Sequence, residues 1–512
     1  MSAPANLRNR LGQGLRSLRG GQVWRPAGQN AANRPVPSDR KADRLVAEQV
    51  FSRIAGAAPV AGNAILLLRD GAENFPAWLA AIEGATTSVH LENYIFRADK
   101  IGTRFAESLA AKARSGVPVR VLIDWMGCLN QAPRSFWARL RAAGVEVRTF
   151  NRPRLDSPFG WLSRNHRKTI SVDGRIGFVA GLCIGDAWMG DPARNQSAWR
   201  DTGIAIEGPA VTDLDTAFAE IWSYTGGGPI APGTPAPSPA LGTGHVSLRV
   251  IASKPNTMGL YRFDQLIAGI ARRTLWLTDA YFVGTTAYVR TLCDAARDGV
   301  DVRLLVPGAS DIPVAKALSR AGYRPLLEAG IRVFEWDGPM LHAKTAVADG
   351  HWARIGSSNL NLASWLGNWE LDVAIEDRGF AAQMEAMFKD DLAHATEIVL
   401  DVDRVHSAPG SARPASHRTR RGSPGRLAAG AVGLGSAVSA AMTNHRALGP
   451  AEAQLMAVGA AVLLVMAGIA VAIPRLLTIP VAVVAAWVAV TLLVRAWRLR
   501  TAPADAEPSG AP

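Results

Sequence analysis

The segments NHRKTISVDG (residues 165–174) and LHAKTAVADG (residues 341–350) share one spacing, His-x-Lys-x4-Asp. Each is typical of a short strand that runs into an Asp-Gly turn. Positions i and i+2 of a strand point to the same side, so each His is predicted to share a face with its Lys. The chain has only eight Lys against 48 Arg, and two of the eight stand here. This bias indicates that the site needs a compact ammonium group rather than a guanidinium.

The sequence around the two motifs repeats as well. In each half a helical pattern precedes an alternating strand that ends on an acid two positions before a tyrosine, at Glu92 and Tyr94 and again at Asp279 and Tyr281. A second helical pattern then closes on glycine before a Val-rich strand. This alternation predicts an α/β fold in each half, with helices covering a largely buried sheet. Two related halves are expected to meet at an interface and to build one site there from both.

Composition divides the chain further. A length of 512 residues is too great for one core. Between the halves, Gly and Pro fill 11 of the 21 positions of TGGGPIAPGTPAPSPALGTGH, a composition typical of a linker. The predicted parts are a basic arm at 1–50, the first repeat at 51–224, the linker at 225–245, the second repeat at 246–400, a basic linker at 401–450 and a membrane hairpin at 451–500.

Charge and hydropathy point to a membrane. The net charge is +13, of which residues 1–44 carry +7 and residues 401–512 carry +6, so the core between them is neutral. Residues 455–473 and 476–494 contain no charged side chain, and 19 helical residues reach about 28 Å, close to the hydrocarbon thickness of a bilayer. Arginines flank both outer ends, which predicts that these ends and the catalytic part face the cytoplasm. The alternatives are a buried helix pair and basic tails that only aid solubility.

The doubled motif also predicts a chemistry. If the halves meet about a pseudo-twofold axis, two imidazoles and two ammonium groups converge on one pocket that suits a phosphate diester. One imidazole can attack phosphorus, and the other can protonate the leaving alcohol and then deprotonate the incoming one. No cofactor and no metal are expected, because the ammonium groups would repel a cation. The candidate catalytic residues are His166, Lys168, Asp173, His342, Lys344 and Asp349.

Asp173 and Asp349 differ from the rest of that set. Their offset points them away from the His/Lys face, which favours a structural role in the turn.

Downstream, Ser357 and Asn359 in GSSN offer a hydroxyl and an amide to phosphate oxygens. Glu370, matched in the first half by Asp201, is a candidate to hold an imidazole through Nδ1–H.

With these motifs the chain resembles the phospholipase D superfamily, and within it the bacterial cardiolipin synthases, over roughly residues 60–395. The resemblance implies two α/β/α halves with one site at their interface and a cofactor-free ping-pong transfer. In that reaction one phosphatidylglycerol gives its phosphatidyl group to histidine and a second accepts it. It also implies His166 as nucleophile and His342 as general acid and base. The chain departs from the family in two features: Cys183 replaces the Asn of Gly-Gly-x-Asn, and the hairpin follows the core.

The partners expected are anionic phospholipids, the membrane and an alcohol acceptor such as phosphatidylglycerol, at the bacterial inner membrane. Nucleic acid is not expected, because the core is neutral. A hydrolytic phospholipase D, a superfamily nuclease and an inactive membrane scaffold remain as alternatives, and the oligomeric state is not indicated. Two roles would explain the apolar residues near the first motif: they line an acyl-chain entrance or they pack in the core. These residues are Phe159, Trp161, Leu162, Trp188, Met189 and Trp199. Cys183 likewise suits either the phosphate site or the core.

Overall fold

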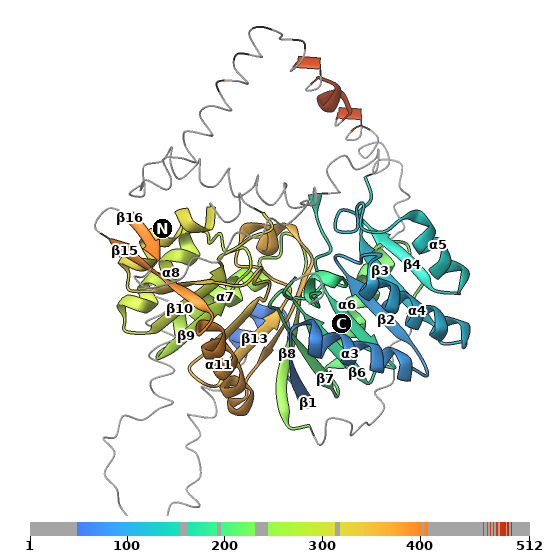
Figure 1. Cartoon of the computed structure of the whole chain (residues 1–512), viewed down its shortest axis with the longest axis horizontal. Helices are drawn as coiled ribbons and strands as arrows, with labels where there is room; N and C mark the ends of the chain where they lie inside the picture. Colours follow the sequence, from blue (N-terminus) through green and yellow to red (C-terminus); the bar gives the residue numbers. More distant parts are fainter. Residues whose placement is uncertain are drawn as a thin grey trace, which may run out of the picture.

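The computed structural model describes residues 49–153, 162–191, 196–230, 244–312, 318–401 and 404–407, with scattered positions between 464 and 493. Within these ranges the chain forms two α/β halves, as the repeat predicted (Figure 1). The predicted arm at 1–50 and the basic linker at 401–450 fall almost wholly outside the described residues. The domain boundaries therefore stay predictions.

The first half contributes seven strands, and the outer three are parallel. Both faces of its inner strands are covered, so every residue of β5 and of β7 is buried, including the polar side chains among them. From the middle of the molecule outward the order is β1 (Val60–Arg69), β7 (Thr202–Glu207), β6 (Ile176–Ala180), β5 (Thr169–Val172), β2 (Val89–Asn93), β3 (Val119–Asp124) and β4 (Glu146–Phe150).

The second half repeats this order and adds an antiparallel pair at its edge. Its strands, from the middle outward, are β8 (Val246–Ser253), β14 (Glu370–Ile375), β13 (Trp352–Gly356), β12 (Thr345–Ala348), β9 (Thr274–Thr278), β10 (Asp301–Pro307), β11 (Arg332–Trp336), β15 (Ala395–Asp401) and β16 (Arg404–Ser407).

The two halves share one continuous sheet. Strand β1 pairs antiparallel with β7 on one side and with β8 on the other, where Val60 lies opposite Leu248 and Asn63 opposite Val246. A register shift separates these two pairs. The described strands therefore form a single mixed sheet of 16 strands with the seam at β1 and β8. The sequence predicted the two halves but not this joining of their sheets.

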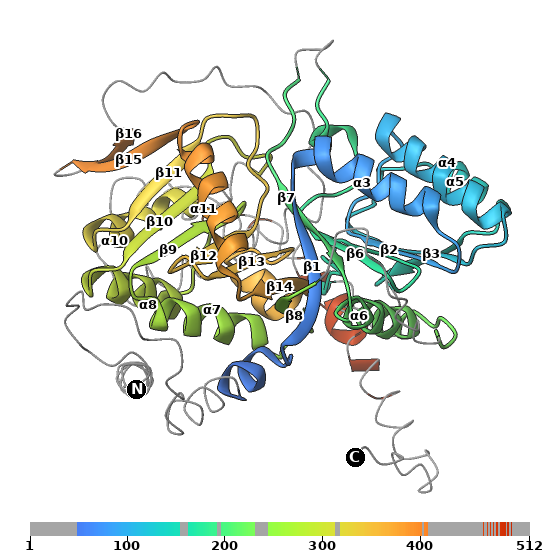
Figure 2. The ribbon, with the colours of Figure 1, turned by 90° about the horizontal axis from the view of Figure 1, so that it is seen from below.

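Helices cover both faces of the sheet. In the first half, α3 (Asp70–Gly84), α4 (Lys100–Arg114) and α5 (Arg134–Ala142) lie opposite α6 (Val211–Tyr224); in the second, α7 (Gly259–Ile270) and α8 (Thr286–Arg297) lie opposite α11 (Arg378–Leu392) (Figure 2). The short α10 (Tyr323–Glu328) packs against α8 and β11. Side chains at helical spacing on α3 and α4, including Phe75, Trp78 and Phe105, form the first-half core, and Leu260, Phe263 and Leu292 do the same in the second.

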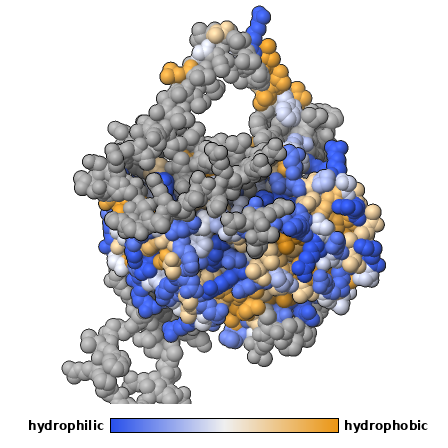
Figure 3. All heavy atoms as spheres, viewed as in Figure 1, coloured by the Kyte–Doolittle hydropathy of each residue, from blue (hydrophilic) through white to orange (hydrophobic). Residues whose placement is uncertain are grey.

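Hydrophilic and apolar residues are mixed on the surface of the two halves. On the part of the face viewed in Figure 1 that is coloured in Figure 3, hydrophilic and apolar residues are intermingled in small patches. None of the helices in the described ranges is long and apolar enough to cross a membrane. The predicted hairpin at 451–500 lies largely outside those ranges.

Candidate active site

The two motif histidines lie where the halves meet, in the loops before β5 and β12, and each motif lysine directly precedes its strand rather than lying on it. His166 precedes β5, and its N–H donates to the carbonyl of Trp369 at 2.9 Å, directly before β14 of the other half. The N–H of His342, before β12, donates in the same way to the carbonyl of Arg200 at 2.7 Å, two residues before β7. Each histidine loop is thus bonded through its backbone to the other half.

The two imidazoles are paired with acids in a crossed arrangement. Nδ1 of His166 lies 2.9 Å from Oε2 of Glu370 in the second half. Nδ1 of His342 lies 2.8 Å from Oδ2 of Asp201 in the first half. Both acids are fully buried. A carboxylate that accepts from Nδ1–H fixes the tautomer, so Nε2 of each ring is left for chemistry.

The two motif lysines are buried beside the histidines, and their charges influence both imidazoles. Lys168 and Lys344 are buried, and each Nζ donates to the carbonyl oxygen of the histidine two positions earlier. Burial lowers the pKa of His166, and the charges of both lysines add to this effect while Glu370 opposes it. Burial lowers the pKa of His342 to about 3, and the same two lysines contribute. Both lysines act on both imidazoles, which supports our proposal that the four side chains form one site.

The GSSN segment contacts the acid that is paired with His166. The hydroxyl of Ser357 donates to Oε2 of Glu370 at 2.6 Å, so it holds the acid. The hydroxyl meets a fully buried carboxylate across the β13–β14 pair, which suits an orienting role, and its contact with phosphate stays a prediction. Oδ1 of Asn359 has no hydrogen-bond partner among the described residues, which leaves its side-chain amide uncommitted at that atom.

The two motif aspartates are placed away from the imidazoles. Asp173 and Asp349 follow β5 and β12, so each lies at the opposite end of its strand from the histidine. The carboxylate of Asp173 accepts from the backbone N–H groups of residues 86–88, and that of Asp349 from residues 272–274. Burial alone would raise the pKa of Asp173, but these N–H donors hold it below its usual value. We therefore propose that both aspartates fix turns and do not take part in catalysis.

This proposal gives a first prediction. Asp173→Ala removes the acceptor for three N–H groups and places alanine at a φ of 58°, so we expect a loss of about 2 kcal/mol in the free energy of unfolding. Asp173→Asn keeps one acceptor and tolerates that φ, so its loss should be smaller. Urea unfolding measures both. A variant that unfolds like the wild type but has lost its activity would contradict a structural role.

Several residues of the site escaped the sequence analysis. The ring of Tyr94 lies edge-on to His166 with centroids 4.8 Å apart, and that of Tyr281 lies likewise to His342 at 6.0 Å. The repeated acid-x-Tyr ends of the strands were the signal that could have placed them there. Arg167, fully buried, donates to three backbone carbonyls, of Ala217, Ser253 and Glu370. No counterpart of this arginine stands in the second motif, so the repeat gave no signal for it.

Burial also bears on the two readings of the apolar residues near the first motif. Trp188 is 0% and Trp199 7% exposed, and both belong to the first-half core, with their rings packed beside His342. Leu162 and Met189 are exposed, and Phe159 and Trp161 lie outside the described residues. Cys183 is 1% exposed within the first-half core, although Lys168 is close enough to influence its pKa.

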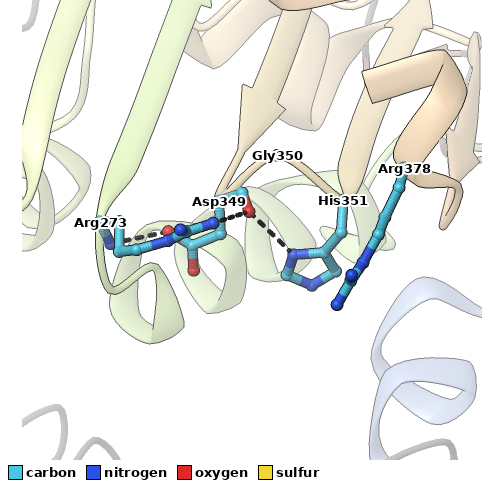
Figure 4. A pocket seen from close by; sticks show the side chains of 5 residues that line it. All are labelled: Arg273, Asp349, Gly350, His351 and Arg378. Atoms are coloured by element: carbon cyan, nitrogen blue, oxygen red, sulfur yellow. Dashed lines mark hydrogen bonds between the residues drawn. The ribbon is translucent and has the colours of Figure 1, made fainter. Parts of the chain in front are cut away.

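A separate surface cavity of about 350 Å³ lies at the far end of β12 from His342. Its lining includes the turn after β12, where Nη2 of Arg273 donates to the carbonyl of Asp349 at 2.7 Å (Figure 4). Arg378 and His351 complete the lining. This cavity is distinct from the paired imidazoles. In the described part of the chain, no group of three or more His, Cys, Asp or Glu side chains is arranged to hold a metal ion.

Comparisons with known proteins match both halves of the chain. A family model described as "Cardiolipin synthase, PLD-like domain" matches residues 78–222 and 266–392, one match in each half. The chain is 31% identical over 377 residues to cardiolipin synthase 1 of Bacillus anthracis, covering 71% of this chain and 72% of that protein. It is 35% identical over 364 residues to a cardiolipin synthase of Geobacillus kaustophilus, covering 70% and 71%.

Among solved structures, the phosphatidylserine synthase of Haemophilus influenzae Rd KW20 superposes with a TM-score of 0.52. The match covers 68% of this chain and 91% of that one at 16% sequence identity, which establishes a likeness of fold alone.

Proposed function

The chain belongs to the cardiolipin synthase family of phospholipase D-like proteins, and from that membership we propose that it makes cardiolipin from two molecules of phosphatidylglycerol. The reaction is a phosphatidyl transfer, in which one phosphodiester bond is exchanged for another. The observation that carries the proposal is the crossed pairing of two imidazoles with two buried carboxylates, beside two buried lysines.

In the first step, Nε2 of His166 attacks phosphorus of a bound phosphatidylglycerol. An N–P bond forms, the P–O bond to glycerol breaks, and Nε2–H of His342 protonates the departing oxygen. The lowered pKa of His166 keeps Nε2 unprotonated and nucleophilic. The anionic substrate favours protonation of His342, because a nearby negative charge stabilises an imidazolium.

In the second step, the hydroxyl of another phosphatidylglycerol gives its proton to Nε2 of His342, and its oxygen attacks phosphorus. The N–P bond breaks, which releases cardiolipin and restores His166. Lys168, Lys344 and Asn359 face the charge on the phosphate oxygens during both steps. Glu370 and Asp201 hold Nδ1–H of the two rings.

The substrates and the flanking segments suggest where the reaction takes place. Both phosphatidylglycerols are anionic lipids, and the basic segments at 1–44 and 401–512 favour a surface of that charge. The uncharged segments at 455–473 and 476–494 are the candidates to anchor the enzyme in the inner membrane with its catalytic part toward the cytoplasm.

The test uses the purified full chain with phosphatidylglycerol vesicles and analysis of the products by mass spectrometry. We expect cardiolipin and glycerol in equal amounts. Phosphatidic acid as the main product would indicate hydrolysis, with water as acceptor in the second step. In a parallel incubation with DNA, cleavage of the DNA without lipid turnover in the vesicles would indicate a nuclease. Either of these results would overturn the proposed transfer.

The lysines give a prediction on pH. Burial lowers the pKa of Lys344 to about 8, and the Lys168 charge contributes. A lysine that must be charged loses its effect as the pH rises through its pKa, so kcat/KM should fall on the alkaline side with a midpoint near 8. Lys344→Arg stays charged at this pH, so its residual kcat/KM should not show the fall. A midpoint that is the same in wild type and variant would contradict the assignment.

A further inference from the structure

The two buried acids are held by different donors. Oε2 of Glu370, which faces His166, also accepts from the hydroxyl of Ser357 at 2.6 Å. Oδ2 of Asp201, which faces His342, instead accepts from the indole N–H of Trp188 at 2.9 Å. The carboxylates are equivalent in the repeat, but a serine supports one and a tryptophan supports the other.

The repeat shows where the first half lacks the serine. Ser357 stands 15 positions after His342, and the residue 15 positions after His166 is Gly181. A Cβ on Gly181 would lie only 2.1 Å from Oδ1 of Asp201, so a side chain at this position would require the Asp201 carboxylate to shift. The donor for Asp201 comes instead from another segment, the 3-10 turn η2 (Asp186–Trp188).

Packing holds the indole of Trp188 against the imidazole of His342, which is the ring that Asp201 contacts. Trp188 is fully buried, and its ring lies edge-on to His342 with centroids 5.5 Å apart and planes at 85°. The ring of Trp199 packs against the ring of Trp188, with their centroids 4.8 Å apart. On the backbone side, a Cβ on Gly71 would lie 2.4 Å from the carbonyl oxygen of Trp188, so α3 is packed directly against this turn. One side chain thus contacts both members of the His342–Asp201 pair.

We propose that Trp188 is a positioning residue: through Asp201 it holds His342 in line for proton transfer to the leaving alcohol. The proposal rests on the phosphatidyl transfer proposed above. Ser357 has the corresponding role for Glu370 and His166. The two donors therefore act on different parts of the reaction, one on proton transfer and one on attack at phosphorus.

The choice of leaving group distinguishes an effect on proton transfer from an effect on the attack at phosphorus. Glycerol departs only with a proton, whereas 4-nitrophenolate departs as a stable anion and needs none. Formation of the phosphohistidine from phosphatidyl-4-nitrophenol therefore depends on His166 but little on His342. A residue that acts through His342 should affect turnover of phosphatidylglycerol and leave the nitrophenolate burst almost unchanged.

The experiment compares three full-chain variants on both substrates. Trp188→Phe keeps a buried aromatic ring without the N–H, and we expect kcat with phosphatidylglycerol to fall about tenfold while the burst rate stays within about twofold of the wild type. Ser357→Ala should lower both rates. Trp365→Phe is the matched control, because the indole of Trp365 donates to buried Asp264 at 3.1 Å, and Asp264 bonds to Arg354 and to neither imidazole.

Equal losses on both substrates for Trp188→Phe, or a loss no greater than that of Trp365→Phe, would overturn the proposal. If Trp188→Phe does not fold, the same comparison is made with 3-benzothienylalanine at position 188, which keeps the fused-ring shape with sulfur in place of N–H. The wild type checks the proposed function separately: if it makes no cardiolipin, the transfer is wrong whatever the variants do.

Discussion

His166→Ala is expected to abolish the covalent lipid–enzyme intermediate and to lower cardiolipin formation by at least about 10⁴-fold. The substitution removes the atom that bonds to phosphorus, and no neighbouring side chain replaces it. The measurement is incubation with radiolabelled phosphatidyl-4-nitrophenol, followed by an alkaline quench, because P–N bonds are stable to base. Wild type should carry label and the variant none.

His342→Ala is the matched comparison, since it removes the other imidazole of the same site. It should still take up label from the activated substrate, because that leaving group needs no proton. It should then transfer the label slowly to phosphatidylglycerol, because no base activates the acceptor hydroxyl. Label that survives in His166→Ala and disappears in His342→Ala would reverse the roles of the two histidines.

Glu370→Gln is expected to lower the rate of phosphohistidine formation about 10²- to 10³-fold, although Glu370 and His166 belong to different halves. The amide keeps the shape of the side chain but no longer stabilises the tautomer or the positive charge that develops on the imidazole. The nitrophenolate burst measures this step directly. Because the pairs are crossed, Asp201→Asn in the first half should spare the burst and lower turnover of phosphatidylglycerol.

Glu376→Gln serves as the control for Glu370→Gln. Glu376 directly follows β14 and pairs with Arg249 at 2.7 Å, with its side chain 36% exposed, so the substitution changes charge near the same strand but outside the site. Its burst rate should match that of the wild type. If Asp201→Asn impaired the burst and Glu370→Gln did not, the crossed assignment of acids to imidazoles would be wrong.

The sequence predicted much of the fold because the needed signals are local. Strand and helix periodicity, glycines after helices and the repeated motif all lie within short windows. The seam between β1 and β8 depends instead on pairing between strands more than 180 positions apart, for which neither Val60 nor Leu248 carries a local signal. The membrane hairpin stays a prediction from hydropathy.

The candidate site was predictable in its residues but not in its connections. Sequence analysis identified Glu370 and Asp201, but spacing along the chain could not tell which imidazole each acid would meet. The same limit applies to Ser357, whose hydroxyl partner is set by packing across β13 and β14. Trp188 was expected at an acyl-chain entrance or in the core, because a bulky aromatic side chain alone does not indicate its hydrogen-bond acceptor.

The continuous sheet across β1 and β8 bears on how lipid reaches phosphorus. In some enzymes two domains rotate apart about a hinge to admit substrate. Here such a rotation would break backbone hydrogen bonds between β1 and β8, and it would separate both histidine loops from their partners in the other half. We therefore expect the core to stay shut through the catalytic cycle. Diacyl substrates would then have to enter, and cardiolipin would have to leave, without a rotation of one half against the other.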